Sequence, residues 1–393
     1  MPTEATLKKI LDAIAADGGE TFVVGGPVRD RLQGIEPKDI DFLVRKLTLN
    51  QIDIAISTIG KADEVGKSFG VVKGTIDGEV FDFVIPRIRE VKTGVSHTDF
   101  IVDTDPFASV ESDLGRRDFT INAMAIPLEE FIFGSVGNII DPFSGGQDLE
   151  NRLIRAVGDP VARFTEDPLR ILRGIQFSTR FGFDIDSATF EAMKSLAPTL
   201  KTVSGERVFE EFKKAWTKGK GDTGRFIDLL QKSGIGALLF GSGFNPATVR
   251  LDGFRGDDLI LAHLTAFFLH GGDMSIMKPE AIHTKFLDVA KKVAFSDLEP
   301  HTFIGNMKPH LPVLFALAFE MDKSLVPKIG KMMNVPLIPK ELAVTGEELI
   351  EILGIKNPKE GKRIGEAQRA MLSAIWNDTL VNEKQKLVDF LKV

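Results

Sequence analysis

The chain has 393 residues and no cysteine, which excludes disulfides and thiolate metal sites and is typical of the reducing cytoplasm. That length exceeds what one hydrophobic core usually supports, so two to four domains are expected. The net charge of −7 repels phosphate overall, so a nucleic-acid partner would need a local basic patch. The longest apolar stretch, residues 259–270, is too short to span a bilayer, which predicts a cytoplasmic protein without a membrane partner.

Residues 1–145 have the alternating and periodic patterns of a mixed α/β domain. Residues 21–24 and 39–44 read as short strands, and 49–60 as a helix with Thr48 as its N-cap. Residues 71–85 read as a hairpin that turns at Asp77 and Gly78. Residues 87–117 are polar with little periodicity, so we predict a long mobile loop there.

Helical periodicity replaces the strand signals from about residue 150 onward. The expected helical segments are 167–181, 187–197, 206–218, 224–234, 258–270, 346–354 and the amphipathic end of the chain, 376–393. His263 and His270 lie on one of these apolar segments, and we interpret both as structural. The chain therefore predicts an α+β head followed by a long all-α region.

Two aspartates lie two residues apart in the predicted strand 39–44. Alternate residues of a strand share a face, so Asp39 and Asp41 would point one way while Phe42 points into the core. Adjacent carboxylates repel unless a cation lies between them, and oxygen ligands suit Mg²⁺. Asp82 lies on the polar face of the hairpin and could supply a third carboxylate.

A glycine pair precedes these aspartates. Gly25 and Gly26 have no side chains, so a phosphate could approach the backbone amides. Pro27 suits the first position of a helix and would place Arg29 in the first turn. A solvated surface turn is the plain alternative, but the combination favours a phosphate-binding turn followed by a metal-binding strand.

Together these features resemble the nucleotidyltransferase fold of the DNA polymerase beta superfamily. More narrowly, they resemble the class II tRNA nucleotidyltransferases (the CCA-adding enzymes) and the bacterial poly(A) polymerases. The resemblance covers nearly the whole chain. The segments that carry it are GGPVRDRLQG and KDIDFLV near the N-terminus, RRDFTINAMA at 116–125, residues 141–186, and the bacillus-type tail segments VTGEELIEILGI and NEKQKLV.

The resemblance implies a nucleotidyltransferase head at 1–145, a base-recognising helical neck at 146–215, a helical body at 216–335 and a tRNA-binding helical tail at 336–393. It implies that Asp39 and Asp41 ligate the catalytic metal and that Asp82 is a third catalytic carboxylate. The nucleotide-binding residues that it implies are Gly25, Gly26, Arg29, Arg116, Arg117, Asp118, Asn122, Asp159, Arg163, Glu166, Asp167, Arg170 and Arg173. For the Arg-Arg-Asp run alone, an ion pair at a helix start is a competing interpretation.

The segment TEDPLRILR, residues 165–173, bears on base choice. If Thr165 caps a helix, Asp167 and Arg170 share one face. Alternatively, Asp167 is itself the N-cap, and its carboxylate accepts hydrogen bonds from backbone amides rather than from a base. By resemblance, Glu166, Asp167 and Arg170 read the incoming base. Arginine offers only donors and a carboxylate only acceptors, which matches the Watson–Crick edges of cytosine and adenine but not of guanine and uracil.

A basic stripe is expected beside this segment. Its members are Arg152, Arg155, Arg163, Arg173 and Arg180. It is a candidate contact for a triphosphate or for the acceptor end of an RNA, and a solvated helical face is the alternative.

The resemblance implies Mg²⁺-dependent, template-independent addition of CCA to the 3′ end of tRNA from CTP and ATP, with release of pyrophosphate, by a monomer or homodimer. Within the same family, the alternatives are an A-adding or CC-adding tRNA enzyme and a poly(A) polymerase. A non-catalytic RNA-binding protein on the same scaffold is the alternative from another class.

Overall fold

The computed structural model describes residues 2–37, 39–63, 70–92, 100–134, 138–218, 223–240, 260, 264, 339–357, 360–376 and 378–392. The chain separates into two compact units, Met1–Ser242 and Gly243–Val393. His263 and His270, and most of the helix expected at 258–270, lie outside the described residues. The four predicted domains therefore stay a prediction. In the described part of the chain, no helix is long and apolar enough to cross a membrane.

A mixed sheet forms the centre of the first unit, with the strand order β3-β4-β5-β2-β1-β8. Its strands are β1 (Glu20–Val24), β2 (Asp41–Arg45), β3 (Lys61–Asp63), β4 (Val71–Ile76), β5 (Glu79–Val84) and β8 (Ala125–Pro127). The β2–β5 pair is parallel, and the other pairs are antiparallel. The structure confirms the predicted hairpin, because Asp77 and Gly78 both have positive φ between β4 and β5.

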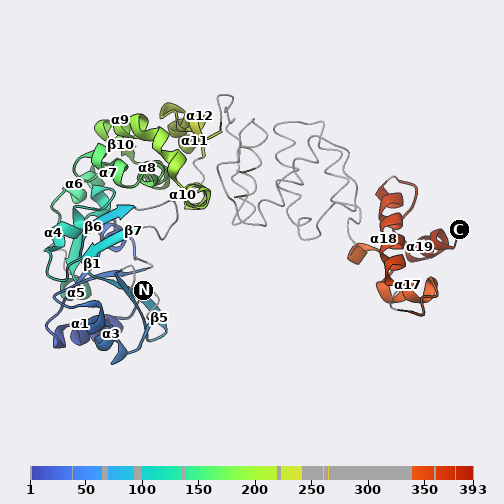
Figure 1. Cartoon of the computed structure of the whole chain (residues 1–393), viewed down its shortest axis with the longest axis horizontal. Coiled ribbons are helices and arrows are strands. Elements are labelled where there is room, and N and C mark those ends of the chain that lie inside the picture. Colours follow the sequence, from blue (N-terminus) through green and yellow to red (C-terminus); the bar gives the residue numbers. More distant parts are fainter. Residues whose placement is uncertain are drawn as a thin grey trace. The chain divides into compact units, whose positions relative to one another are not determined.

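Helices of the first unit cover the sheet and continue beyond it (Figure 1). Those closest to the sheet are α1 (Glu4–Ala16), α2 (Gly26–Leu32), α3 (Leu49–Ser57), α4 (Val110–Leu114), α5 (Leu128–Ile132) and α6 (Gly145–Glu150). Those beyond the sheet are α7 (Pro160–Glu166), α8 (Leu169–Phe181), α9 (Ser187–Leu196), α10 (Gly205–Lys218), α11 (Thr223–Lys232) and α12 (Ile235–Phe240). The 3₁₀ turns within the described residues are η2 (Thr120–Asn122), η3 (Ala197–Thr202) and, in the second unit, η8 (Pro339–Glu341).

Aromatic packing fixes which face of the central strands is buried. The Phe42 ring of β2 lies 5.7 Å from that of Phe81 and 5.2 Å from that of Phe83 on β5. All three rings are at most 3% exposed. The alternation of the strands turns Asp41 and Asp82 to the opposite face. The predicted division of these strands into a buried face and a polar face is therefore confirmed.

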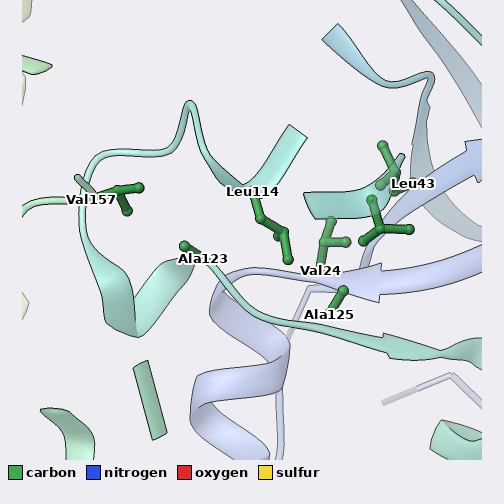
Figure 2. Packing of buried hydrophobic residues seen from close by; sticks show 7 residues of the cluster. Val24, Leu43, Leu114, Ala123, Ala125 and Val157 are labelled. Carbon is green, nitrogen blue, oxygen red and sulfur yellow. The ribbon is translucent and has the colours of Figure 1, made fainter. Parts of the chain in front are cut away.

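A second apolar cluster joins the polar face of the sheet to the segment that follows α4. Val24 of β1 and Leu43 of β2 belong to one cluster with Leu114 of α4, and the cluster extends through Ala125 and Ala123 to Val157 (Figure 2). Burial of large apolar side chains in such a cluster contributes about 1.5–3 kcal/mol each. The cluster holds the residues that follow α4 in place against the centre of the sheet.

Three predicted features need correction. Residues 87–117 do not form a continuous loop, because β6 (Arg87–Lys92) and β7 (Phe100–Thr104) pair as an antiparallel hairpin and α4 follows. Strands also recur after residue 150, where β9 (Leu153–Ile154) pairs in parallel with β10 (Asp184–Ile185). Finally, β2 begins at Asp41, so Asp39 precedes the strand rather than lying in it.

The second unit contains three described helices, α17 (Gly346–Ile352), α18 (Gly361–Trp376) and α19 (Lys384–Leu391). Thr345 and Glu348 form a capping box at the start of α17. Leu349, Met371 and Leu387, one from each helix, are fully buried in a shared core. The expected amphipathic packing of the C-terminal segment is thus confirmed.

Candidate active site

A polar cleft of about 620 Å³ opens between the sheet and α8. Eight arginines and five aspartates line it: Arg29, Arg87, Arg116, Arg117, Arg170, Arg173, Arg180 and Arg207, with Asp41, Asp82, Asp113, Asp118 and Asp167. The remaining lining residues are Val24, Gly26, Val71, Val84, Asn122, Leu169 and Phe177. In a protein with a net charge of −7, this concentration of arginine makes the cleft a local site for phosphate.

Two carboxylates stand side by side in the cleft. Asp41 begins β2, and Asp82 is its register partner on the parallel strand β5. Asp39 is exposed just before β2 and is not among the residues that line the cleft. Lys73 of β4 lies 3.5 Å from Asp82, as a partly exposed ion pair. Strand pairing, rather than the spacing of two residues within one strand, therefore brings the acids of the cleft together.

The pKa of Asp41 reflects its surroundings. Desolvation by the neighbouring protein atoms raises the pKa of the Asp41 carboxyl, although part of the side chain is open to solvent. Arg117 opposes that increase in pKa, whereas Asp82 and Asp39 add to it by repulsion. All three acids thus share one electrostatic environment, and a bound cation would relieve their repulsion.

The donor set fits a magnesium ion that shares its coordination shell with other oxygens. Within the described residues, no three or more His, Cys, Asp or Glu side chains are grouped so as to hold a metal ion alone. Mg²⁺ commonly takes one or two carboxylates and completes its octahedron with water and substrate phosphates. Asp41 and Asp82, adjacent and on the same sheet face, meet that requirement.

The glycine turn has the expected form. Gly25 has φ 77° and ψ −124°, a conformation that favours glycine, and it precedes α2 with Pro27 in the first turn. A Cβ on Gly25 would lie 2.5 Å from the Arg117 Nη1 atom. Gly26 lines the cleft and Gly25 does not. The absence of side chains here leaves room for Arg117 over the turn.

A buried hydrogen-bonded network connects this turn to α8. Arg29 Nη1 donates to Asn122 Oδ1 at 2.5 Å, and Asn122 Nδ2 donates to Asp118 Oδ1 at 3.3 Å. Arg173 of α8 donates to Asp118 Oδ2 through Nε at 2.8 Å and Nη2 at 2.6 Å. Burial would raise the pKa of Asp118, but the charge and hydrogen bonds of Arg173 outweigh it and lower that pKa. Four predicted nucleotide-binding residues are therefore held in one array.

The Arg-Arg-Asp run begins where α4 ends. Arg117 Nη2 pairs with Asp113 at 3.2 Å, and its Nη1 donates to the Asn122 carbonyl at 3.3 Å. The Arg116 carbonyl accepts a hydrogen bond of 2.9 Å from Arg170 Nη2. The competing interpretation placed an ion pair at a helix start. Arg117 does form an ion pair, but with Asp113 of the preceding helix α4, and it lines the cleft together with Arg116.

The base-recognition segment is arranged differently from the prediction. Thr165 does not cap a helix, because it lies within α7, where its hydroxyl donates to the Val161 carbonyl at 2.7 Å. The side chains of Asp167 and Arg170 do not pair with each other, although the Arg170 amide donates to the Asp167 carbonyl at 3.0 Å. Asp167 Oδ1 accepts from the Leu169 amide at 3.1 Å, while its Oδ2 pairs with Arg207 Nη2 at 2.7 Å.

Arg170 instead pairs with Glu166 at 2.9 Å, and Glu166 also pairs with Arg163 at 2.5 Å. The alternative in which Asp167 is the N-cap is wrong, because Pro168 is the N-cap of α8, but one Asp167 oxygen does accept from a backbone amide as that alternative expected. Asp167 and Arg170 both line the cleft, so each can still present a polar edge to a bound base.

Several predicted residues lie outside the lining of the cleft. Asp159 is the N-cap of α7, where it accepts from the Val161 amide at 3.1 Å. Arg163 donates to the Gly115 carbonyl at 3.0 Å and, with its partner Glu166, is not a lining residue. These residues support the segments on either side of the cleft.

The predicted basic stripe is divided. Arg155 pairs with Asp148 at 3.1 Å and with Asp186 at 2.8 Å, while Arg152 donates to the Gly182 carbonyl at 3.4 Å. Neither of these two arginines lines the cleft, whereas Arg173 and Arg180 do. The stripe is thus not one continuous surface.

Arg207 of α10 is a cleft residue that the sequence patterns did not indicate. It lies in an amphipathic helix with many charged side chains, where no single position stands out. Its ion pair with Asp167 joins residues 40 positions apart. Only the packing of α10 against α8 brings them together.

Comparisons with known proteins agree with this geometry. Residues 21–155 match the family described as the Poly A polymerase head domain, and residues 182–246 match the one described as a probable RNA and SrmB-binding site of polymerase A. A CCA-adding enzyme of Streptococcus suis is 39% identical over 53% of this chain. The matched region covers 50% of that enzyme's own length. A CCA-adding enzyme of Streptococcus agalactiae is 29% identical over 98% of this chain and 95% of its own length.

Solved structures resemble the whole fold. A Bacillus stearothermophilus CCA-adding enzyme in complex with CTP matches with a TM-score of 0.68 at 24% identity, covering 100% of this chain and 98% of that one. A Thermotoga maritima CCA-adding enzyme complexed with tRNA_CCA matches with a TM-score of 0.58 at 22% identity, covering 99% and 94%. The α+β architecture read from the sequence is thereby confirmed.

Proposed function

This chain belongs to the nucleotidyltransferase family that includes the poly(A) polymerases and the CCA-adding enzymes, and from this premise we propose that it adds CCA to the 3′ end of tRNA. CTP and ATP are the proposed nucleotide substrates, and pyrophosphate is the leaving group. Among the relatives are enzymes whose structures are described as complexes with CTP, with ATP and with tRNA_CCA.

The observation that carries this proposal is the composition of the cleft. Paired carboxylates, Asp41 and Asp82, share it with arginines that can hold phosphates. At its other side lie Asp167 and Arg170, an acceptor and a donor group of the kind that a base edge requires. One site of about 620 Å³ thus contains the chemistry for metal, triphosphate and base.

Nucleotidyltransferases of the polymerase family generally use a divalent metal ion, and we assign Mg²⁺ to Asp41 and Asp82, with Asp39 as a further ligand. When bound, the ion supplies Lewis acidity at the α-phosphate and lowers the pKa of the attacking 3′-hydroxyl. Asp41 and Asp82 would hold their carboxylates toward the cleft from a rigid pair of strands. The raised pKa of Asp41 makes cation binding at this position more favourable at neutral pH than at acid pH.

The arginines would orient the nucleotide. Arg29 and Arg117 lie beside the glycine turn, and Arg173 is aimed by Asp118. Guanidinium groups bind phosphate through paired N–H donors, so this set would fix the triphosphate relative to the carboxylates. Correct orientation of the attacking hydroxyl and the α-phosphate is a large part of such catalysis.

Base choice is assigned to Asp167 and Arg170. A carboxylate accepts from the amino group of cytosine or adenine, and a guanidinium donates to the neighbouring ring nitrogen. Uracil and guanine present the reverse polarity and would leave buried groups unpaired. Because the ion pair with Arg207 holds the Asp167 carboxylate in place, Asp167 and Arg170 could read CTP first and then ATP.

The proposed organisation places the nucleotidyltransferase head at 1–145, the neck at 146–215, the body at 216–335 and a tRNA-binding tail at 336–393. The packing of α10 on α8 and the separate core of α17, α18 and α19 support the neck and the tail.

A product-length experiment tests the proposed function. The protein is incubated with Mg²⁺ and with CTP, ATP or both, on a tRNA that ends at the discriminator base and, separately, on a tRNA that already ends in CC. On the first tRNA we expect addition of two residues with CTP alone and of three with both nucleotides. Addition of A only to a tRNA that already ends in CC, arrest after CC with both nucleotides, or an extended run of A would identify one of the alternative enzymes. No extension under any condition would favour a non-catalytic RNA-binding protein.

A further inference from the structure

We propose that Arg180, one member of the predicted basic stripe that lines the cleft, completes a phosphate subsite together with Arg29 and binds the triphosphate of the incoming nucleotide. The inference rests on the proposed function, since it deepens the description of the same cleft. It concerns the phosphate tail alone and is independent of which base is selected.

One aromatic ring holds two guanidinium groups in this region. The Arg29 Cζ atom lies 4.7 Å from the centre of the Phe181 ring, and the Arg180 Cζ atom lies 4.9 Å from it. Both arginines line the cleft. Cation–π contact stabilises each charge on the ring, but it does not neutralise either. Two like charges therefore contact the same ring and line the same cleft.

The other contacts of these arginines differ. Arg29 is paired with Asp30, at 2.6 Å from Nη2, and donates to Asn122. Arg180 makes no hydrogen bond or ion pair with any residue in the described part of the chain. Arg180 therefore brings to the lining of the cleft a charged group whose N–H donors have the capacity to bind an anion.

Maintaining this charge is unfavourable in the absence of a ligand. Burial lowers the pKa of Arg180, and repulsion from Arg29 lowers it further, against a smaller opposing effect of Asp30. The pKa shift of an arginine does not neutralise it near pH 7. A phosphate group between Arg29 and Arg180 would relieve the repulsion between them, as an anion does in sites built of converging guanidinium groups.

The position of Arg180 along α8 favours contact with the phosphates of a bound nucleotide over contact with its base. Arg170, Arg173, Phe177 and Arg180 all line the cleft from this one helix. Ten residues separate Arg170 from Arg180, which corresponds to about 15 Å of helix at 1.5 Å per residue. A nucleotide whose base lies at Arg170 can thus extend its phosphates along α8 toward Arg180.

A backbone phosphate of the RNA primer is the other possible source of this chemistry. The shared ring with Arg29 favours the nucleotide, because Arg29 lies beside the phosphate-binding turn. The Arg29 Nη2 atom is 3.5 Å from the point where a Cβ on Gly26 would stand. Arg180 therefore shares the Phe181 ring with an arginine that lies beside the glycine turn.

The test uses the full chain and measures binding of inorganic tripolyphosphate by calorimetry, without RNA and without turnover. We expect Arg180→Ala to weaken tripolyphosphate binding about tenfold, since it removes a charge-assisted contact. Arg180→Lys, which keeps the charge, should lose less. Arg152→Ala is the matched control, because Arg152 also stacks on a ring, that of Phe183 at 5.6 Å, but does not line the cleft.

Kinetics then separate the two sources of phosphate. In Arg180→Ala we expect KM to rise about tenfold for CTP and ATP alike, with the affinity for tRNA unchanged. Unaltered tripolyphosphate binding, or an equal loss in Arg152→Ala, would overturn the proposal. A rise in the KM for tRNA alone would also overturn it and would assign Arg180 to the primer. Because the calorimetric arm needs no RNA, failure of the proposed function would leave its result intact.

Discussion

Asp118 is a single acid that holds together the turn, the 3₁₀ segment η2 and α8. Its two oxygens accept from Asn122, from the Phe119 amide and from Arg173. Only 8% of the residue is exposed, so removing Arg173 would leave a buried charge without its compensating cation. The sequence indicated Asp118 through the Arg-Arg-Asp motif, but the partner 55 positions away is set by the fold.

We predict that Asp118 makes folding stability depend on acid pH. Its pKa is lowered in the folded state, so its contribution is complete above the ordinary aspartate pKa of about 4 and is lost as the pH falls through the lowered value. Thermal unfolding between neutral and acid pH measures this. In Asp118→Asn, Tm should be lower at neutral pH, and the difference from the wild type should shrink at low pH. A constant difference would contradict the assignment.

Arg207 acts through Asp167, according to the geometry, and is therefore a positioning residue. We predict that Arg207→Ala raises misincorporation of UTP relative to CTP by about tenfold, because Asp167 loses the partner that orients its Oδ2 atom. The ratio of kcat/KM values for CTP and UTP measures the change. Arg207→Lys should restore part of the selectivity.

The matched control for that experiment is Lys213→Ala, on the same helix but outside the cleft, which should leave the ratio unchanged. If the CTP-to-UTP ratio of kcat/KM in Arg207→Ala equalled that of the wild type, the orientation of Asp167 would not depend on Arg207.

At the scale of elements, strong local signals predicted the structure well. The Asp77–Gly78 turn and the Thr48 cap were identified from residue types alone, and both are present, the latter as a full capping box with Gln51. The hairpin β6–β7 was not predicted, because β6 is highly charged and the pairing of the two strands is a contact between segments. Sequence reasoning likewise missed the Arg207–Asp167 pair, since it depends on the packing of α10 on α8.

Close packing of α3 on the sheet gives a prediction for one glycine. A Cβ on Gly74 of β4 would lie 2.7 Å from Ile56 Cγ2 and 2.9 Å from Phe83 Cε2. We expect Gly74→Ala to reduce the free energy of unfolding by about 1–3 kcal/mol through overpacking. Gly361→Ala is the control, since a Cβ there meets nothing within 4 Å and alanine favours the helix. Equal stabilities in a denaturant titration would contradict the packing argument.

At the scale of the whole molecule, an acidic chain concentrates arginine in one cleft. The net charge of −7 opposes nonspecific binding of nucleic acid, while the cleft supplies a local attraction for phosphate. We predict that tRNA binding weakens at least about tenfold between roughly 50 and 200 mM salt, because bound phosphates release counterions. Fluorescence titration at several salt concentrations measures the slope, and a slope near zero would exclude phosphate contacts as the basis of binding.

The central claim is that the carboxylates on β2 and β5 perform nucleotidyl transfer to an RNA end. The most direct test is the rate of CMP incorporation into tRNA that ends at the discriminator base, measured with Mg²⁺ for Asp41→Asn, Asp82→Asn and the control Glu79→Gln. Glu79 lies on β5 but not in the cleft. We predict that each aspartate substitution lowers kcat at least about 100-fold, with Tm preserved, and that the control keeps the wild-type rate. Incorporation by Asp41→Asn at the wild-type rate would contradict the account.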